Sequence, residues 1–430
     1  MLALTGARAG DIPPAPDARF ARQLNSLGAF RFGRGEYSQA ESLFAQAVSL
    51  GLADAVFNLA ATLRAEARYS EAEAMYQRAL ALPQTQAPQS PERTASVLCG
   101  LALLYRDTAR FAESEKMARR ALDLREKAAE RDETNIAWTL NLVGTLAQAQ
   151  ERTAEAAGLF QQALDTAQKA PSPDAPTIVD ILINEGNAER SSGDLSNARR
   201  HLENAARMLG ANGDRVRTAA VLNGLALVKR AGGHFKQARL LDTRALLLIE
   251  AALGKEHPDY SAALSSVALV EQDLHNSHQA RELYREALAI DERVLGPNHP
   301  RVGADLTNLG AVAARQHNYA AAESYFRRAL RLEQERRPGS RQLALRMANL
   351  AALYVHQKRA TEALELYRRA IRILYAEDCE GDMRVADILH EYAELLRAAG
   401  SFAEAEEAET RAMRMRVKYV LANHDDVGHG

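Results

Sequence analysis

The sequence predicts an all-α fold, a solenoid of ten stacked helical hairpins. Three observations predict it: small residues recur with a period close to 42 residues, large apolar residues lie between them at helical spacing, and polar turns interrupt each period. A single hairpin cannot bury its own apolar face, so it must stack on its neighbours. We therefore expect one array over residues 20–418, rather than the roughly three domains of about 150 residues that a length of 430 suggests.

Small residues form three columns in this repeat. The first column consists of Ala40, Ala72, Ser114, Ala156, Ala198, Ala238, Ala280, Ala322, Ala363 and Ala405. The second, seven residues later in each unit, consists of Ala47, Ala79, Ala121, Ala163, Ala205, Ala245, Ala287, Ala329, Ala370 and Ala412. The third, twelve residues before the first, consists of Gly28, Ala60, Ala102, Gly144, Gly186, Ala226, Ala268, Gly310, Ala351 and Ala393. Such columns predict helices that pack at close distance, because small side chains bring helix axes together.

Two amphipathic helices are expected in each unit. Large apolar residues lie between the columns, three and four positions apart. Examples are Leu27, Tyr37 and Phe44 in the first unit and Leu309, Tyr319 and Phe326 in the eighth. Glycine-bearing turns at 34–36, 192–194 and 399–401 separate the two helices, because glycine adopts the positive φ that ends a helix.

This order of small residue, turn, aromatic and alanine resembles the tetratricopeptide repeat, over about residues 20–418. The period of 42, and the linkers at 253–258 and 295–300, resemble the kinesin-light-chain type, and the resemblance favours a bacterial protein. It implies a right-handed superhelix in which the first helix of each hairpin lines a concave groove. In that family the groove receives an extended peptide or a helix of another protein. Similar arrays are attached to bacterial signalling NTPases and caspase-like proteases, but no such catalytic domain is found in this sequence.

Three repeats depart from the pattern. Glu185 replaces the usual leucine of repeat 5, while Asp242 and Glu409 replace the aromatic residue of repeats 6 and 10. A terminal repeat is expected to be atypical because its outer face meets water.

Composition excludes several classes of function. The chain carries 54 Lys and Arg against 56 Asp and Glu, a net charge of −2, which argues against a general binder of nucleic acid or anionic membranes. No run approaches the roughly 20 apolar residues of a membrane-spanning helix. The two cysteines, Cys99 and Cys379, lie six repeats apart, so we expect free thiols and a cytoplasmic protein.

Catalytic and metal-binding signatures are weak. No phosphate-binding loop or nucleophile elbow is found. His390 and Glu391 resemble the start of a zinc-protease helix, but Glu394 stands where the second histidine is needed, which favours a solvated pair of His390 with Glu394. His275 and His278 bracket a turn without a third ligand. We therefore expect no enzyme, no cofactor and no metal site.

Two further histidines could be mistaken for a catalytic pair. His257 and His299 each precede a proline, which disfavours helix at the residue before it. They are expected to end loops just before a new helix.

Asparagine recurs where the resemblance places the groove. The position of the usual leucine directly precedes the third column. Four asparagines stand directly before that position, namely Asn58, Asn184, Asn308 and Asn349, and three stand one position earlier, namely Asn25, Asn141 and Asn223. An amide offers donors and an acceptor, so these residues could hold a partner's peptide backbone. The alternative is that the amides bond neighbouring helices or turns.

Arginine recurs five residues after that apolar position, at Arg64, Arg106, Arg190, Arg230 and Arg397. Arginine pairs well with carboxylates, which suggests a partner with acidic side chains or a free C-terminus. The alternative is a solvated face, since arginine is a good helix former. Trp138 is expected on the inner side, either as a partner anchor or in the core.

The sequence thus predicts a non-catalytic scaffold or adaptor that binds a protein or peptide in its groove. The alternative is a regulatory subunit of a separately encoded signalling NTPase or caspase-like protease. Residues 1–19 are expected to be a disordered lead, and residues 419–430 a flexible polar tail. Because Ala7-Arg8-Ala9 has the form of a signal-peptide cleavage site, an exported protein whose start lies upstream is the alternative to a cytoplasmic one.

Overall fold

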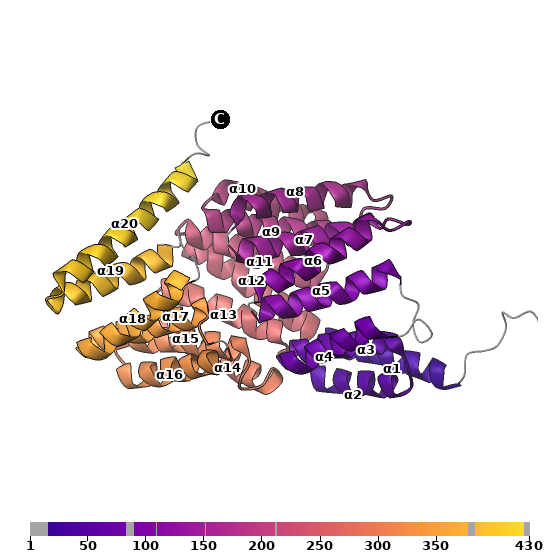
Figure 1. Cartoon of the computed structure of the whole chain (residues 1–430), viewed down its shortest axis with the longest axis horizontal. Coiled ribbons are helices and arrows are strands. Elements are labelled where there is room, and N and C mark those ends of the chain that lie inside the picture. The colour runs from indigo at the N-terminus through magenta and orange to yellow at the C-terminus, as the bar shows by residue number, and fades with distance from the viewer. Residues whose placement is uncertain are drawn as a thin grey trace, which may run out of the picture. The chain divides into compact units, whose positions relative to one another are not determined.

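The computed structural model describes residues 16–82, 90–108, 110–150, 152–210, 213–336, 338–376 and 383–424, and within these ranges the chain is all-α. Figure 1 shows the order of the helices. Their bounds are α1 Pro16–Gly33, α2 Tyr37–Ser49, α3 Ala53–Ala65, α4 Tyr69–Ala81, α5 Pro91–Asp107, α6 Phe111–Glu126, α7 Glu133–Ala149, α8 Thr153–Lys169, α9 Ala175–Ser192, α10 Leu195–Leu209, α11 Arg215–Ala231, α12 Phe235–Leu253, α13 Pro258–Asp273, α14 Ser277–Val294, α15 Pro300–Arg315, α16 Tyr319–Arg336, α17 Arg341–His356, α18 Ala360–Ala376, α19 Met383–Ala398 and α20 Phe402–His424. The 20 helices of the described residues confirm the expectation of an all-α fold of ten hairpins.

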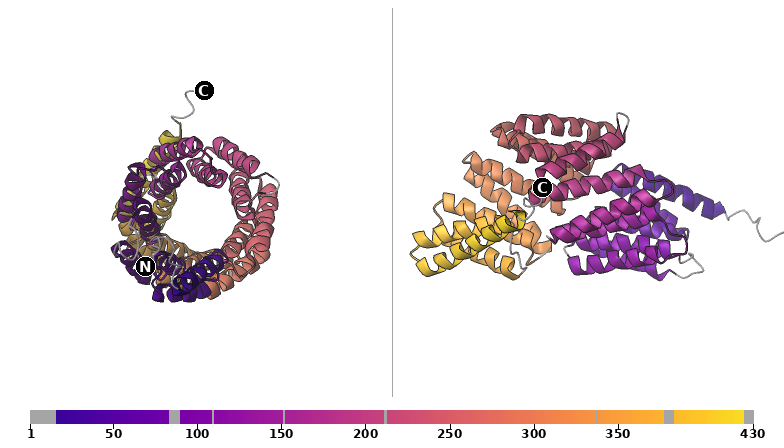
Figure 2. Two further views of the ribbon diagram at one scale, coloured as in Figure 1. Left: turned by 90° about the vertical axis from the view of Figure 1, so that its right-hand side faces the viewer. Right: turned by 90° about the horizontal axis from the view of Figure 1, so that it is seen from above.

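From α1 to α6, and from α8 to α20, each helix packs on the next one along the chain. In these ranges an odd-numbered first helix pairs with the even-numbered second helix that follows it, and that second helix packs on the next hairpin, as α12 does on α13. The right-hand view of Figure 2 shows this pairing for the yellow hairpin α19–α20. The chain divides into two compact units, residues 1–146 and 147–430, and the division falls within α7.

The three columns of small residues lie at the helix contacts. All ten residues of the first column, from Ala40 to Ala405, have no measurable exposure. Gly310 on α15 shows why the third column must stay small, since a Cβ there would lie 2.5 Å from Cε1 of Phe326 on α16. The predicted register is therefore confirmed.

The turns between paired helices also follow the predicted chemistry. Gly35, Gly193 and Gly400 all adopt positive φ angles, between 73° and 95°. His257 and His299 precede α13 and α15, and the Nδ1 atom of each accepts a hydrogen bond from a backbone N–H two residues later, at 3.0 and 3.2 Å. They therefore cap new helices, as expected.

The helices extend past the expected limits of the array. The first helix, α1, begins at Pro16, inside the segment expected to be disordered, and the last, α20, continues to His424, so residues 419–424 are helical rather than a flexible tail. The expectations for residues 1–15 and 425–430, and for the thiol of Cys379, lie outside the described residues. Cys99 is a buried free thiol, and burial raises its pKa to about 11. Among the described helices, none combines the length and the apolar character needed to cross a membrane.

Candidate partner-binding face

The first helices of neighbouring hairpins touch one another. Such contacts join α1 to α3 and α3 to α5 in the first unit, and α9 to α11, α11 to α13 and α17 to α19 in the second. Helices on the inside of a curved stack approach one another most closely, so these contacts place α1, α3 and α5 on the inner face of the first unit and α9, α11, α13, α17 and α19 on that of the second. The first helix α15 takes the same place in its own repeat. We call this surface of the first helices the inner face.

Three of the predicted asparagines form hydrogen bonds between helices. The Nδ2 atom of Asn58 on α3 donates to Oδ1 of Asn25 on α1 at 2.8 Å, and Nδ2 of Asn223 on α11 donates to Oδ1 of Asp242 on α12 at 3.0 Å. These hydrogen bonds are of the kind expected from the alternative to partner binding, in which the amides join neighbouring helices. Asn141 on α7 is buried and also interacts within the chain.

The other predicted asparagines lie at the surface of the second unit. Asn184 on α9 and Asn308 on α15 are half-buried, and Asn349 on α17 is exposed. Asn184 has an interaction within the chain. For Asn308 and Asn349 the described residues provide no side-chain hydrogen bond, so these two amides remain available to a partner.

Most of the predicted arginines pair with carboxylates of their own chain. Arg64 on α3 pairs with Asp107 on α5, and Arg230 on α11 pairs with Asp273 on α13, 43 residues ahead in both cases. Arg106 also contacts Asp107, at 3.1 Å. Burial disfavours the charged form of Arg64, but the Asp107 carboxylate outweighs it and holds the pKa of Arg64 above its ordinary value.

The aspartates that pair with these arginines were not among the residues predicted from the sequence. The signal was present, since an acidic residue stands 43 positions after Arg64 and after Arg230. Arg397 likewise contacts Glu409 at 3.2 Å, and the other expected pair in that region, His390 with Glu394, is 3.9 Å apart.

Arg190 on α9 differs from the other arginines of this set. No carboxylate of the described residues pairs with it, and its Nη2 atom donates only to Oγ of Ser191 at 3.3 Å. Burial, and then the positive charge of Arg230, lower the pKa of Arg190. The guanidinium therefore carries a charge that the surrounding helices do not neutralise.

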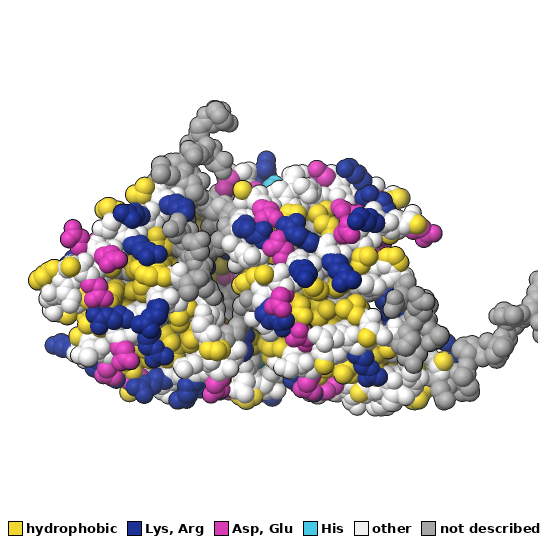
Figure 3. Space-filling view, in the orientation of Figure 1, with side chains coloured by type: hydrophobic (Ala, Val, Ile, Leu, Met, Phe, Trp, Pro, Cys, Tyr) yellow, Lys and Arg dark blue, Asp and Glu magenta, His cyan; other side chains and the backbone are white. Residues whose placement is uncertain are grey.

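Trp138 lies on α7, in the first unit, and is 36% exposed. It is thus neither fully in the core nor fully at the surface. Charged side chains of both signs are scattered over both units on the face shown in Figure 3, in keeping with the small net charge.

Models of the tetratricopeptide repeat match most of the sequence. One matches residues 93–169, 218–292, 259–335 and 343–416, and a second matches residues 55–89. These models describe repeats, and no catalytic family is indicated. No curated protein matches the sequence.

Solved structures of repeat proteins resemble this chain. A signal-transduction ATPase of the STAND class with a tetratricopeptide-repeat sensor, from Pyrococcus horikoshii, has a TM-score of 0.53 at 15% identity, covering 90% of this chain and 54% of that one. A Rap protein complexed with competence and sporulation factor has a TM-score of 0.51 at 16% identity, covering 94% and 99%. A kinesin light chain repeat protein from Podospora anserina has a TM-score of 0.39 at 20% identity, covering 46% and 94%. At these identities the likenesses to the ATPase and to the Rap protein show the fold alone.

Proposed function

Because the chain belongs to the tetratricopeptide-repeat family, we propose that it is a non-catalytic scaffold that binds a peptide or helix of another protein on its inner face. The observation that carries the proposal is the set of polar groups on the first helices of the second unit. Arg190 has no carboxylate partner, and Asn308 and Asn349 have no side-chain hydrogen bond, among the described residues.

The chemistry of these groups suggests what they bind. Amides can donate to and accept from an extended backbone whatever its side chains, and a guanidinium forms paired hydrogen bonds with a carboxylate. The ligand is therefore an extended or helical segment with acidic side chains or a free C-terminus. The Rap protein of similar fold, solved in complex with competence and sporulation factor, supports a ligand-binding role for such an array.

Affinity capture from a lysate of the source organism, followed by mass spectrometry, tests this proposal. The variant changes Asn184, Asn308 and Asn349 together to alanine. The matched control changes Gln162, Gln237 and Gln279 to alanine, since these are exposed carboxamides on the second helices α8, α12 and α14. We expect the control and the wild type to retain a partner that the asparagine variant loses, with helicity and melting unchanged. A partner retained equally by all three proteins would contradict binding by these amides.

The second candidate function is regulation of a separately encoded signalling NTPase or caspase-like protease. The likeness that favours it is the ATPase with a tetratricopeptide-repeat sensor, which covers 90% of this chain. This function predicts a complex of fixed stoichiometry with such an enzyme, and the asparagine variant would retain that complex if the enzyme binds elsewhere.

A further inference from the structure

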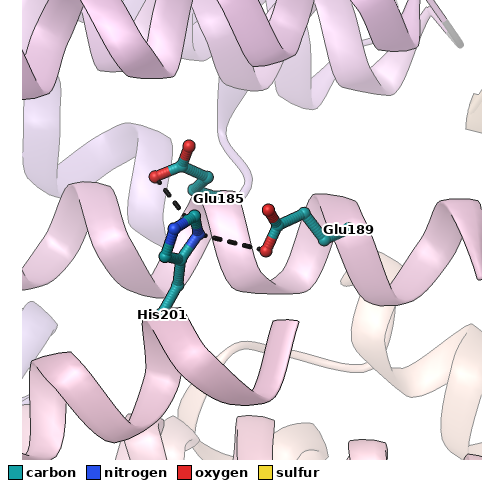
Figure 4. A group of neighbouring side chains, drawn as sticks. All are labelled: Glu185, Glu189 and His201. Atoms are coloured by element: carbon teal, nitrogen blue, oxygen red, sulfur yellow. Dashed lines mark ion pairs between the residues drawn. The ribbon is translucent and has the colours of Figure 1, made fainter. Parts of the chain in front are cut away.

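Three ionisable side chains converge between the helices of the fifth hairpin. Glu185 and Glu189 lie one turn apart on α9, and His201 faces them from α10, as Figure 4 shows. The Nδ1 atom of His201 is 3.5 Å from Oε2 of Glu185 and 3.1 Å from Oε2 of Glu189. One potential ligand atom from each residue lies within 4.8 Å of the other two.

The facing atoms of this cluster are buried and unsatisfied. The side chains of Glu185, His201 and Glu189 are only 10%, 17% and 21% exposed. Oε2 of both glutamates and Nδ1 of the histidine make no hydrogen bond within the described part of the chain. Glu185 is thus a nine-tenths buried carboxylate whose Oε2 atom faces the cluster without a hydrogen-bond donor among the described residues. Burial of such an atom is costly unless a cation or proton is bound there.

The surrounding charges do not supply that cation. The exposed Arg200 lies on the other side of the imidazole, with Nη2 3.5 Å from Nε2 of His201, and Asp194 adds another negative charge nearby. Burial, together with Glu185 and Asp194, raises the pKa of Glu189 to about 7, and burial raises the pKa of Glu185 as well. The positive charge around the two carboxylates is therefore too small to neutralise them.

The other nine repeats show what normally fills these positions. The place of Glu185 is always apolar, occupied by Leu27, Leu59, Leu101, Val143, Leu225, Val267, Leu309, Leu350 and Tyr392. The place of His201 is also always apolar, occupied by Leu43, Met75, Met117, Leu159, Leu241, Leu283, Tyr325, Leu366 and Ala408. The place of Glu189 is apolar in six of the nine, and where repeat 7 has Glu271 the facing residue is Leu283. Only repeat 5 has ionisable residues at all three positions. These three substitutions therefore form one polar cluster and are not scattered variation.

The distances suit a small divalent cation. With metal–ligand bonds of about 2.1 Å, two ligands of a tetrahedral ion lie about 3.4 Å apart, close to the 3.1 and 3.5 Å observed. One imidazole nitrogen and two carboxylate oxygens form a donor set accepted by Zn²⁺ and related first-row ions. A charge of +2 would also neutralise the two carboxylates.

We propose that Glu185, Glu189 and His201 bind a first-row divalent cation such as Zn²⁺, which links α9 to α10. Three protein ligands leave a fourth position for water. The bound ion replaces the apolar contact that the other nine hairpins make at the same place. No metal site was expected from the sequence because these ligands come from two helices and match no short motif. Glu185 was recognised only as a departure from the repeat.

Zinc binding by the full chain, after treatment with EDTA and dialysis, tests this site. We expect isothermal titration calorimetry to find one high-affinity equivalent of Zn²⁺ and the melting temperature to rise when Zn²⁺ is added. The variant His201→Leu carries the residue usual at this place, so it should fold, and we expect its zinc affinity to fall at least about tenfold. The control is His278→Leu on α14, because this exposed histidine lies outside the cluster and the variant should bind like the wild type.

A second variant and a second probe distinguish the loss of a metal ligand from misfolding. Glu189→Gln keeps the size of the side chain while weakening a ligand, and its circular dichroism should match that of the wild type. Co²⁺ provides a spectroscopic readout, since its visible absorption should appear with the wild type and disappear with His201→Leu. Equal zinc binding by His201→Leu and His278→Leu, or no response of the wild-type melting temperature to Zn²⁺ and EDTA, would overturn the proposal.

Discussion

The fifth and eighth hairpins place very different side chains on the same backbone frame. In α9–α10, Gly186 lies against Leu202, and the adjacent Glu185 is buried beside His201. In α15–α16, Gly310 lies against Phe326, and the adjacent Leu309 is only 1% exposed. Small residues at the helix contacts are common to both, so they set the geometry of the hairpin. The residues beside them can therefore be either apolar side chains that pack in the core or ionisable side chains.

The first prediction places the glutamate of the fifth hairpin at the equivalent position of the eighth hairpin, without the histidine. Changing Leu309 to Glu should destabilise the second unit by about 3–5 kcal/mol, because it buries a carboxylate where the eighth hairpin offers no histidine. Urea denaturation followed by circular dichroism measures the change. The control Leu309→Gln separates polarity from charge and should cost less at pH 7. If Leu309→Glu costs under about 1 kcal/mol, the place is less enclosed than its 1% exposure indicates.

The second prediction concerns the sixth hairpin, where Asp242 takes the place of Phe326. Burial raises the pKa of Asp242 from its ordinary 3.8 to about 6, although the hydrogen bond from Asn223 opposes the shift. A carboxyl with a raised folded-state pKa stabilises the fold below about pH 4, and this contribution is lost as the pH rises towards 6. At 1.36 kcal/mol per pH unit, the loss is up to about 3 kcal/mol.

Urea denaturation at pH values from 4 to 7 checks this, with Asp242→Asn as the reference. We expect the stability of the wild type to fall relative to the variant between about pH 4 and 6 and to stay level above that. A difference that does not change with pH would show that Asp242 ionises as it does in the unfolded chain.

The third prediction tests the common frame of the hairpins. Ala163 on α8 and Ala329 on α16 have 0% and 1% exposure, so replacing either with leucine should overpack a helix contact and cost about 1–3 kcal/mol. Thermal and urea unfolding measure the loss. A change within about 0.5 kcal/mol would mean that these contacts can expand without strain. Replacing the exposed Ala154 or Ala320 with leucine provides the control.

The frame was predictable from sequence because it repeats. Ala40 and its nine equivalents are all small, being alanines except for Ser114, so their spacing alone indicated the hairpins and their register, and all ten are buried. The candidate site was less predictable, because an asparagine or arginine at a given register looks the same whether it bonds a neighbour or a ligand. In the structure Asn58 contacts Asn25, and Arg64 contacts Asp107, and in both pairs the partner lies in the neighbouring repeat. The acidic residue 43 positions after Arg64 is visible in the sequence, but a one-dimensional pattern does not show which side chains meet between hairpins.

The smallest predicted effect again separates the fifth hairpin from its neighbours. Arg64 and Arg230 each pair with an aspartate in the next repeat, whereas the corresponding position for Arg190 is the exposed Ala231. Changing Ala231 to Asp should give Arg190 the same ion pair. The expected gain is about 0.2–1 kcal/mol, because the pair is partly exposed and salt screens it.

A double-mutant cycle of Ala231→Asp with Arg190→Gln, measured by urea denaturation at low and high salt, isolates this coupling. Ala231→Asn is the uncharged control. We also expect Ala231→Asp to weaken partner capture, because a neutralised Arg190 no longer attracts an acidic ligand. If the cycle shows coupling but capture is unchanged, Arg190 contributes to stacking between repeats and not to partner binding. The inner face would then act through Asn308 and Asn349 alone.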